Sequence, residues 1–252
     1  MNAVSRERVA VVTGAARNIG RAIALELAAS GATIVVNARS SVDEAAETVR
    51  AIEAIGGRAV VELADVSDPG GAQALMDAAA QRFGQIDILV NNAALRREVS
   101  FEDLDWQQWR EVMSVILDGA YLCARAALPY LRKAGGGAIV NIGGMSAHAG
   151  SAGRAHVIAA KAGLVGLTRA LAHDLAPDNI TANCVVPGLI ATQRGGAAGN
   201  AEPAHHAERK TLLGRRGLPE EVASVVGFLC SDKARYLTGQ VIHANGGAYL
   251  GS

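Results

Sequence analysis

Short aliphatic runs alternate along this chain with longer segments of helical periodicity, and this alternation constrains the fold more than any other feature. Seven of the runs predict strands. Several of them are aliphatic without polar alternation, which is typical of strands that are covered on both faces. Repeated strand–helix units build a parallel sheet with helices packed against it. The sequence therefore predicts an α/β fold around a parallel sheet.

The predicted strands span residues 9–13, 33–37, 58–63, 86–90, 138–142, 180–185 and 240–243. The predicted helices span residues 19–30, 42–55, 69–83, 106–133, 155–175 and 219–229. Ser41, followed three residues later by Glu44, predicts a capping box at the start of the second helix. Pro69 and Pro219 fit first-turn positions, where the missing N–H costs nothing. Residues 193–210 have no clear period and predict a mobile loop that acts as a lid over a pocket.

The chain is long enough, at 252 residues, to bury a core without disulfides or metals. No polar or proline-rich linker divides it, so residues 1–252 are expected to form a single domain. Its 24 Lys and Arg residues balance 24 Asp and Glu residues, which argues against nucleic acid as the main partner. Neither a signal core nor a membrane-length apolar run is found, so we expect a cytoplasmic protein without a membrane partner.

The three cysteines, Cys123, Cys184 and Cys230, lie far apart among aliphatic residues. This spacing matches neither a disulfide framework nor a zinc site. It predicts buried thiols in a reducing compartment, and no metal centre is expected.

A glycine turn joins the first predicted strand to the first predicted helix, in the segment Thr13-Gly14-Ala15-Ala16-Arg17-Asn18-Ile19-Gly20. Glycine lets the backbone approach a ligand closely, and the free N–H groups and dipole of the following helix attract an anion. Asn18 stands at the middle glycine of a T-G-x-x-x-G-x-G pattern, and asparagine tolerates a positive φ. The turn therefore predicts a cradle for the pyrophosphate of a dinucleotide.

Together with this turn, motifs along nearly the whole chain resemble those of short-chain dehydrogenase/reductases, close to the 3-oxoacyl-acyl-carrier-protein reductases. The motifs are Asp65-Val66, Asn91-Asn92-Ala93-Ala94, Lys161 within Ala-Ala-Lys-Ala-Gly, Pro187-Gly188, Gly214 to Ala223, and Leu237-Thr238-Gly239-Gln240 leading to Gly246-Gly247. The resemblance implies a doubly wound, seven-stranded sheet of the Rossmann type. It also implies a dinucleotide at the carboxyl edge of the strands, a small-molecule substrate and, usually, a tetramer.

The resemblance further implies which residues hold the dinucleotide. They are Thr13, Gly14, Arg17, Asn18, Ile19, Gly20, Asn37, Arg39, Ser40, Asp65, Val66, Asn91, Ala93, Lys161, Pro187, Gly188, Ile190 and Thr192. Enzymes of this architecture that use NAD place an acid at the end of the second strand, whereas those that use NADP supply cations there. Here Asn37 ends the predicted strand, Arg39 follows, and Arg17 can reach the same corner. We therefore predict NADP(H) over NAD(H), because guanidinium groups bind phosphate well. The alternative is that Arg39 is only a solvated loop cation.

Three of the four family catalytic positions carry no polar side chain. The family uses a Tyr, a Lys four residues later, a Ser and an Asn. Lys161 is present, but Val157 stands at the Tyr position, Gly144 at the Ser position and Ile116 at the Asn position. In the enoyl-reductase variant the Tyr lies seven residues before the Lys, and that residue is Arg154. Because a proton donor and an oxyanion donor each contribute orders of magnitude in rate, we expect efficient reduction of simple ketones by the usual route to be lost.

Substitute proton carriers are available in Ser146, His148, His156 and the pair His205-His206 of the predicted lid. Imidazole titrates near neutral pH. His156, however, lies about 140° around a regular helix from Lys161 and should face elsewhere. The alternative for His148 and His156 is a surface or interface position.

Arg96 and Arg97 follow the Asn91 turn, where they would border the substrate entrance and attract an acidic substrate, or be exposed loop cations without such a role. The aromatic residues of the fourth helix are expected to pack between subunits of a homotetramer or homodimer. They are Trp106, Trp109, Tyr121 and Tyr130.

These observations leave three functions open. The first, which we favour, is an NADP(H)-dependent oxidoreductase whose substrate is an imine, a polarised alkene or a carbonyl compound that carries its own acid. The second is a dinucleotide-binding partner or regulatory subunit of a hetero-oligomer, without redox turnover. The third is a lyase or isomerase that uses the pocket without net oxidation.

Overall fold

The computed structural model describes residues 7–192 and 210–251, so His205-His206 and all of the predicted lid except Lys210 lie outside the described residues. One seven-stranded sheet has the order β3-β2-β1-β4-β5-β6-β7, and every neighbouring pair is parallel. The strands are β1 Arg8–Val12, β2 Ala32–Ala38, β3 Arg58–Leu63, β4 Ile88–Asn91, β5 Gly137–Ile142, β6 Ile180–Pro187 and β7 Val241–Ala244. The predicted doubly wound parallel sheet is confirmed.

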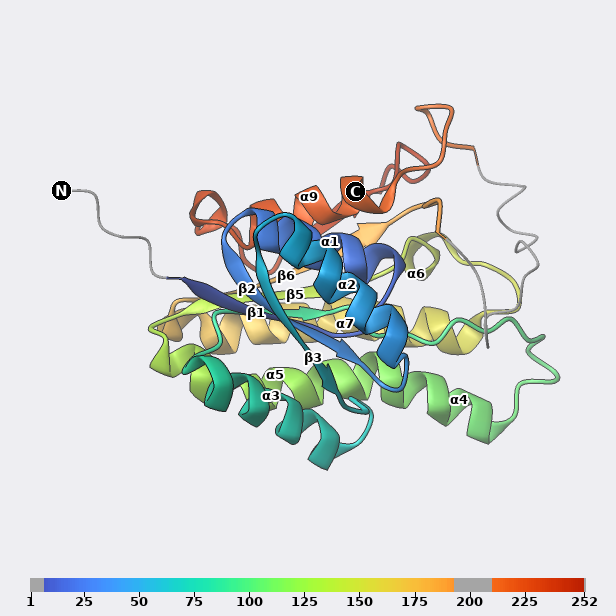
Figure 1. Cartoon of the computed structure of the whole chain (residues 1–252). Helices are drawn as coiled ribbons and strands as arrows, with labels where there is room; N and C mark the ends of the chain where they lie inside the picture. Colours follow the sequence, from blue (N-terminus) through green and yellow to red (C-terminus); the bar gives the residue numbers. More distant parts are fainter. Residues whose placement is uncertain (1–6, 193–209, 252) are drawn as a thin grey trace.

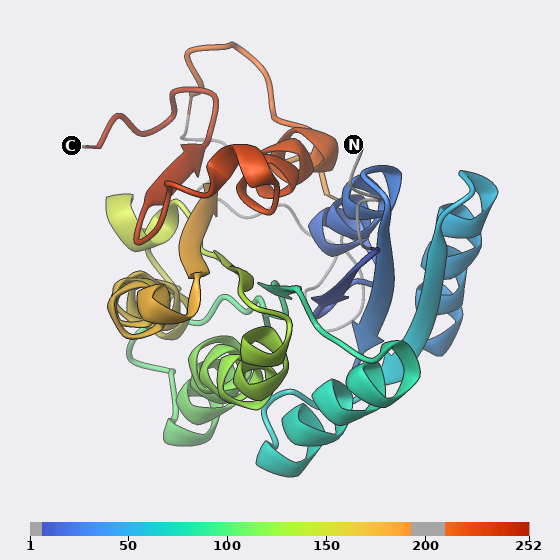
Figure 2. The same ribbon diagram turned by 90° about the vertical axis from the view of Figure 1, so that its left-hand side faces the viewer.

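Helices cover both faces of this sheet. In Figure 1, α1, α2 and α9 lie on one side of the strands, and α3, α5 and α7 lie on the other. Figure 2 shows the ends of the strand order, β3 and β7, on opposite sides of the molecule. The helices are α1 Asn18–Ala29, α2 Val42–Ala54, α3 Pro69–Phe83, α4 Trp106–Met113, α5 Gly119–Lys133, α6 Ser146–Ala149, α7 Ala155–Leu175 and α9 Pro219–Leu229.

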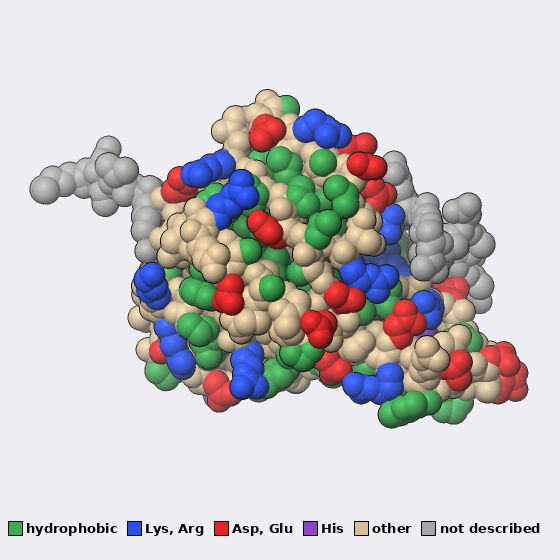
Figure 3. All heavy atoms as spheres, turned by 60° about the horizontal axis from the view of Figure 1, so that its bottom comes forward, with side chains coloured by type: hydrophobic (Ala, Val, Ile, Leu, Met, Phe, Trp, Pro, Cys, Tyr) green, Lys and Arg blue, Asp and Glu red, His purple; other side chains and the backbone are tan. Residues whose placement is uncertain are grey.

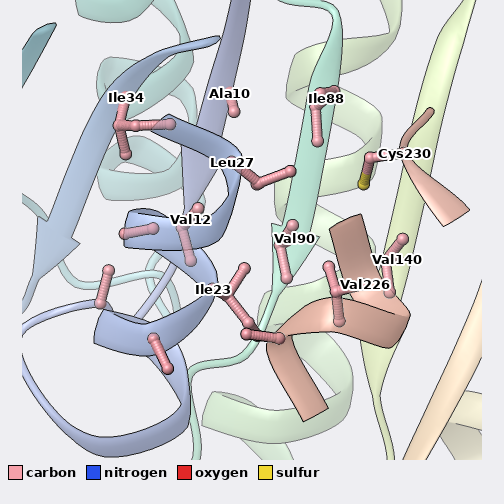
Figure 4. Packing of buried hydrophobic residues seen from close by; sticks show 14 of the residues in the cluster. Ala10, Val12, Ile23, Leu27, Ile34, Ile88, Val90, Val140, Val226 and Cys230 are labelled. Atoms are coloured by element: carbon pink, nitrogen blue, oxygen red, sulfur yellow. The ribbon is translucent and has the colours of Figure 1, made fainter. Parts of the chain in front are cut away.

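Strand residues alternate between two apolar layers, one on each face of the sheet. Ala10 and Val12 of β1 belong to the layer beneath α1 and α9, which Figure 4 shows from close by. Val9 and Val11 of the same strand point into the opposite layer, against α3 and α5. Because helices cover both faces of the sheet, the strands can be aliphatic throughout. Burial of each Val, Leu or Ile side chain contributes about 1.5–3 kcal/mol to the stability of the fold.

The three cysteines are free and buried, as predicted. Burial raises the pKa of Cys123 to about 12 and that of Cys230 to about 12. Burial also raises the pKa of Cys184, to about 11. All three thiols are therefore packing groups rather than nucleophiles at neutral pH.

The predicted capping box of α2 is wrong. Ser41 makes no side-chain cap hydrogen bond, and its ψ of 70° departs from the extended conformation that a capping residue needs. The Glu44 carboxylate instead accepts a hydrogen bond from Arg17, with 3.3 Å between Nη1 and Oε1. Capping by side chains is found elsewhere, for example where Asp105 and Gln108 form a capping box at α4.

The predicted helix over 106–133 is interrupted. A π-helical segment, Ser114–Asp118, separates α4 from α5. A π-helical bulge shifts the helical phase of the residues that follow, and Ile116 within this segment is buried at 2% exposure. Sequence periodicity could not show this shift, because the apolar pattern is continuous on both sides.

Two helical segments, Trp106–Lys133 and Ala155–Asp178, are long and apolar enough on average to cross a membrane, although only by length and composition. In this fold, α5 and α7 within them contact the sheet. The space-filling view in Figure 3 shows Lys and Arg side chains interspersed with Asp and Glu over the face that includes these helices, rather than one basic field. That distribution agrees with the balanced charge of the sequence.

Candidate active site

The glycine turn between β1 and α1 forms a tight cradle. Gly14 has φ +62° and Asn18 has φ 52°, so Asn18 adopts the left-handed conformation that its position requires. A Cβ at Gly20 would overlap the Gly14 carbonyl oxygen and lie 2.5 Å from Asn92 Nδ2. Only glycine fits there, because the helix start presses directly against the turn.

Hydrogen bonds from the end of β4 hold this turn. Asn92 Nδ2 donates to the carbonyl oxygens of Thr13 and Gly14, both at 2.9 Å. The Thr13 hydroxyl accepts from the backbone N–H groups of Asn92 and Ala93, each at 3.0 Å. The first and fourth strand ends are thus fixed to each other, and their backbone positions are set before any ligand arrives.

A groove runs from this cradle along the carboxyl edge of the sheet. Most of the predicted dinucleotide residues on this side line it. They are Gly14, Arg17, Asn18, Ile19, Gly20, Asn37, Arg39, Ser40, Asp65, Val66 and Ala93. An anion-attracting helix start, close backbone approach and a long open groove are what a dinucleotide pyrophosphate requires. The residues present therefore fit a dinucleotide.

Two residues predicted to bind the dinucleotide, Thr13 and Asn91, do not line the groove, and their side chains bond to other parts of the protein instead. Thr13 ties the turns together, as described above, and lies behind the groove. Asn91 is buried, and its Nδ2 donates to Asn141 Oδ1 at 2.9 Å, while Asn141 Nδ2 donates to Thr168. From this segment, the neighbouring Asn92 lines the groove together with Ala93.

Where the groove passes the end of β2, arginine side chains line it, and no acidic residue stands at the strand end. Strand β2 extends to Ala38, one residue further than predicted, and Arg39 follows. Asn37 is buried and donates to the Glu62 and Ala64 carbonyl oxygens at 3.1 and 3.2 Å, so its side chain joins strand ends. Arg39 is exposed and lines the groove with Arg17.

Two carboxylates lie close to these arginines. Glu44 pairs with Arg17 at 3.3 Å, with both side chains about half exposed. Partial burial tends to raise the pKa of Asp65, but the hydroxyl and N–H of Ser67 and the Arg39 charge outweigh it and lower the pKa. Asp65 is thus ionised and engaged by Ser67, at 2.6 Å from its hydroxyl. Exposed ion pairs of this kind contribute only about 0–1 kcal/mol and leave the guanidinium groups able to bind a phosphate.

The groove continues into a second pocket, and the two share Ile19, Asn92 and Arg96 in their walls. Five further residues that the resemblance predicts to hold the dinucleotide line this pocket. They are Lys161, Pro187, Gly188, Ile190 and Thr192. A Cβ at Gly188 would lie 2.6 Å from Asn245 Cα, so the chain passes very close to the segment after β7. The pocket is where a substrate would meet the cofactor.

Lys161 is the principal titratable group of the pocket. Its ammonium donates a hydrogen bond to the Ile142 carbonyl oxygen at the end of β5. Burial, followed by the Arg96 and Arg154 charges, lowers the pKa of Lys161 to about 7, against a smaller opposite effect of Cys184. At neutral pH this lysine therefore exchanges a proton readily.

Of the three positions that the family resemblance aligns with the Ser, Tyr and Asn, two lie in the pocket with Lys161. Gly144 and Val157 line the pocket, and a Cβ at Gly144 would come no closer than 3.8 Å to Lys161 Cγ. Val157 and Ile116 belong to one apolar cluster between α7 and the π-helical segment. None of the residues that line the pocket in the described parts of the chain is a tyrosine.

The substitute proton carriers are divided by the structure. Ser146 lines the pocket, and its Oγ lies 3.3 Å from Arg154 Nη1. His148 is not among the lining residues, and its ring stacks edge-on against His243 with 4.6 Å between centroids. Burial, and then the Arg169 charge, lowers the pKa of His148.

His156 is not at the surface, contrary to the surface alternative. It is fully buried, and neither ring nitrogen has a hydrogen-bond partner within the described residues. Burial and the charges of Arg154 and Arg97 lower its pKa, so the ring is neutral. As expected from the helical angle, it does not line the pocket that holds Lys161.

Sequence reasoning assigned no binding role to Asn92 and Arg154, which both line the pocket. Asn92 stands inside a quoted motif, and its proximity to Gly14 could not be found from spacing. Arg154 is the N-cap residue of α7 and precedes Lys161 by seven residues, or about two helical turns. The seven-residue spacing from Lys161 could therefore have indicated from the sequence that Arg154 lies near the pocket.

A parallel sheet, a glycine cradle at its carboxyl edge and a helix lysine in the adjoining pocket together define a short-chain dehydrogenase/reductase. A family model described as "Enoyl-(Acyl carrier protein) reductase" matches residues 14–249. The chain belongs to this family of oxidoreductases, which confirms the family resemblance.

Individual relatives are similar over their whole length. The 3-oxoacyl-[acyl-carrier-protein] reductase FabG of Staphylococcus aureus (strain Mu50) is 38% identical over 96% of this chain and 98% of that protein. A crystal structure of acetoin dehydrogenase YohF from Salmonella typhimurium is 38% identical, with a TM-score of 0.86 over 96% of this chain and 95% of the other. A Sinorhizobium meliloti 1021 structure, provisionally described as a short-chain alcohol dehydrogenase, is 40% identical with a TM-score of 0.90 over 96% of both chains.

Proposed function

We propose that this protein is an NADP(H)-dependent oxidoreductase whose proton chemistry differs from that of its family. The observation that carries the proposal is the joined groove and pocket. The groove keeps the glycine cradle, while the pocket keeps Lys161 with Gly144 and Val157 at the Ser and Tyr positions.

The cofactor assignment rests on the corner after β2. Arg17, Arg39, Ser40 and Ser41 line it, and Ala38 stands at the strand end. Guanidinium groups and hydroxyls bind a ribose 2′-phosphate, whereas a ribose 2′-hydroxyl would call for an acid at the strand end. The nicotinamide, when bound, supplies or accepts a hydride at the substrate carbon.

Lys161 performs two tasks in this proposal. Its position at the nicotinamide end suits it to bind the ribose of that half of the cofactor, as the family resemblance implies. With a pKa of about 7, it also holds a proton that it can deliver at neutral pH. Val157 and Gly144 offer neither a hydroxyl for proton transfer nor a donor for an alkoxide.

The substrate class follows from this chemistry. Reduction of an ordinary ketone develops negative charge on oxygen, which the family stabilises with Ser and Tyr hydroxyls at the positions that Gly144 and Val157 occupy here. An imine, a polarised alkene or a carbonyl compound with its own acid needs less help. These are the substrates we assign to the pocket.

A homotetramer or homodimer in the cytoplasm completes the proposal. Trp106 of α4 is 73% exposed, and Tyr121 of α5 is 45% exposed, so both are free to pack against another subunit. Tyr130 is already engaged, because its hydroxyl donates to Asp77. The expected aromatic contact between subunits therefore centres on Trp106 and Tyr121.

Cofactor titration and a substrate panel test the proposal. Protein is titrated with NADPH and NADH while the fluorescence of the reduced cofactor is followed. NADPH is then mixed with a cyclic imine, an enone and ethyl acetoacetate, and the loss of absorbance is recorded. We expect tighter binding of NADPH and consumption with the imine or enone. Equal affinities would contradict the cofactor assignment, and binding without consumption across the panel would favour a regulatory subunit.

A further inference from the structure

Lys161 is a buried amine at the wall of the pocket. Its side chain is only 9% exposed and lines the pocket. Within the described residues it donates a hydrogen bond to the Ile142 carbonyl oxygen, and no Asp or Glu of these residues pairs with it. A carbonyl oxygen accepts from a neutral amine as well as from an ammonium, whereas a carboxylate would hold the ammonium form. These surroundings allow Lys161 to be a neutral amine.

Burial favours that neutral form. It is the largest cause that lowers the pKa of Lys161 to about 7, while Arg96 and Arg154 act in the same direction and Cys184 acts against them. A lysine in water has a pKa of about 10.4, so at pH 7 fewer than about one such amine in a thousand carries a lone pair. For Lys161 the share at pH 7 is about half. A desolvated, neutral lysine is a nucleophile towards carbonyl carbon.

The pocket leaves space beside this amine. A Cβ at Gly144 would come no closer than 3.8 Å to Lys161 Cγ. Val157 lies one helical turn before Lys161 on α7, and neither Gly144 nor Val157 has a polar side chain. Many of the other lining side chains are small or apolar, such as Ala94 and Leu189. A small carbonyl compound of low polarity suits these walls.

We infer that Lys161 is a covalent site, whose amine forms an imine with a small aldehyde or ketone when the cofactor ribose does not occupy it. The inference rests on the proposed function, since it takes this pocket as the substrate site and Lys161 as the ribose contact. It adds a reaction that needs no hydride transfer.

The step balances with the atoms of the amine and the carbonyl compound alone. The Nζ lone pair attacks the carbonyl carbon, and one N–H proton passes to the oxygen to give a carbinolamine. The hydroxyl then leaves as water with the second N–H proton, and a C=N bond forms. An imine makes the neighbouring C–H bonds more acidic, which is what a lyase or isomerase without net oxidation requires.

Reductive trapping tests the inference. Cofactor-free protein is incubated at pH 7 with butanal and cyanoborohydride, which converts an imine into a stable secondary amine. Peptide mass mapping then identifies the butylated residues. The sequence has four lysines, and the other three are exposed and serve as internal references, namely Lys133, Lys210 and Lys233. We expect Lys161 to be labelled at least about tenfold faster than any of them. Labelling of Lys161 at or below the rate of the references would overturn the inference.

A matched pair of variants tests the lack of an acidic partner. Gly144→Asp places a carboxylate beside Lys161 and stabilises its ammonium form, whereas Gly144→Asn has nearly the same size and no charge. Labelling of Lys161 at pH 7 should be at least about tenfold slower in the variant with Asp than in the variant with Asn. Equal rates in two folded variants would contradict the inference.

The pH dependence in the wild type gives the same answer if the variant with Asp does not fold. The ratio of Lys161 labelling to reference labelling should fall between pH 7 and pH 9. Solvated amines gain lone pairs across this range, whereas Lys161 already has about half of its own at pH 7. A constant ratio would overturn the inference.

Addition of NADP⁺ separates this inference from the proposed function. Saturating NADP⁺ should protect Lys161 from butanal, because ribose and imine compete for one amine. Fast labelling that NADP⁺ does not slow would support the imine site and contradict the ribose contact of the proposed function. Slow labelling of a protein that consumes NADPH with the imine or enone would overturn this inference alone.

Discussion

The dinucleotide groove and the neighbouring substrate pocket differ in how tightly the protein packs around their backbone. In the groove, Asn92 and Thr13 fix the turn with four hydrogen bonds, and the backbone approaches so closely that a Cβ at Gly20 has no space. In the pocket, a Cβ at Gly144 has space, and Val157 is part of an apolar cluster. Under the proposed function, cofactor binding and family-type proton transfer are separable within one fold.

The largest expected effect comes from Lys161, which lines the pocket. Lys161→Met should lower turnover by about 10²–10⁴, because the proton donor is removed. The measurement is NADPH consumption with the best substrate of the panel. Lys133→Met, on the exposed end of α5, is the control. Turnover within threefold of the wild type would show that Lys161 carries no proton.

The same variant also changes the pH dependence of stability. Burial lowers the folded pKa of Lys161 from 10.5 to about 7, so between these values the unfolded state binds more protons. Wild-type stability should therefore rise with pH across that window, and Lys161→Met should lack this rise. Urea unfolding of both proteins at pH 6.5 and pH 9 measures it. A parallel pH dependence in the two proteins would mean that the lysine is not buried as described.

A matched pair of glycine substitutions compares the two regions directly. Gly20→Ala should destabilise the protein by about 1–3 kcal/mol through overpacking and weaken NADPH binding. Gly144→Ala should be neutral or stabilise by up to about 1 kcal/mol, because its φ is not in the left-handed range and the site has space. Thermal unfolding with and without NADPH measures both. Similar losses in the two variants would remove the contrast between groove and pocket.

A smaller effect is expected at the ribose corner. Arg39→Met should weaken NADPH binding about tenfold and leave NADH binding nearly unchanged, since only NADPH presents a phosphate there. Arg50→Met, on the exposed side of α2, serves as the matched control. Fluorescence titration gives the dissociation constants. An equal loss for both cofactors would indicate that Arg39 supports the fold rather than the phosphate.

Much of the fold followed from the sequence, because strand and helix periods are local signals. The strands fall within one or two residues of their predicted positions, and Asn18 has the positive φ that its place in the turn required. Lys161 and the lack of polar groups at Gly144 and Val157 were readable from motif spacing alone.

The remaining features depend on contacts between distant segments. The π-helical turn at Ser114–Asp118 leaves the apolar pattern continuous, so the inward shift of Ile116 had no sequence signal. The burial of His156 depends on how other elements pack against α7. The exchange of roles between Asn91 and Asn92 is set by which side chain reaches the Gly14 turn, and adjacent residues of one type look alike in a sequence.

In the proposed function, the groove binds the cofactor as in the family, while Gly144 and Val157 leave the pocket without the family's Ser and Tyr hydroxyls. The most direct test is the rate of NADPH consumption with ethyl acetoacetate by the wild type and by the double variant Gly144→Ser with Val157→Tyr. We expect a rate at least about tenfold higher in the double variant, with an unchanged dissociation constant for NADPH. A wild-type rate equal to or above that of a folded, NADPH-binding double variant would contradict it.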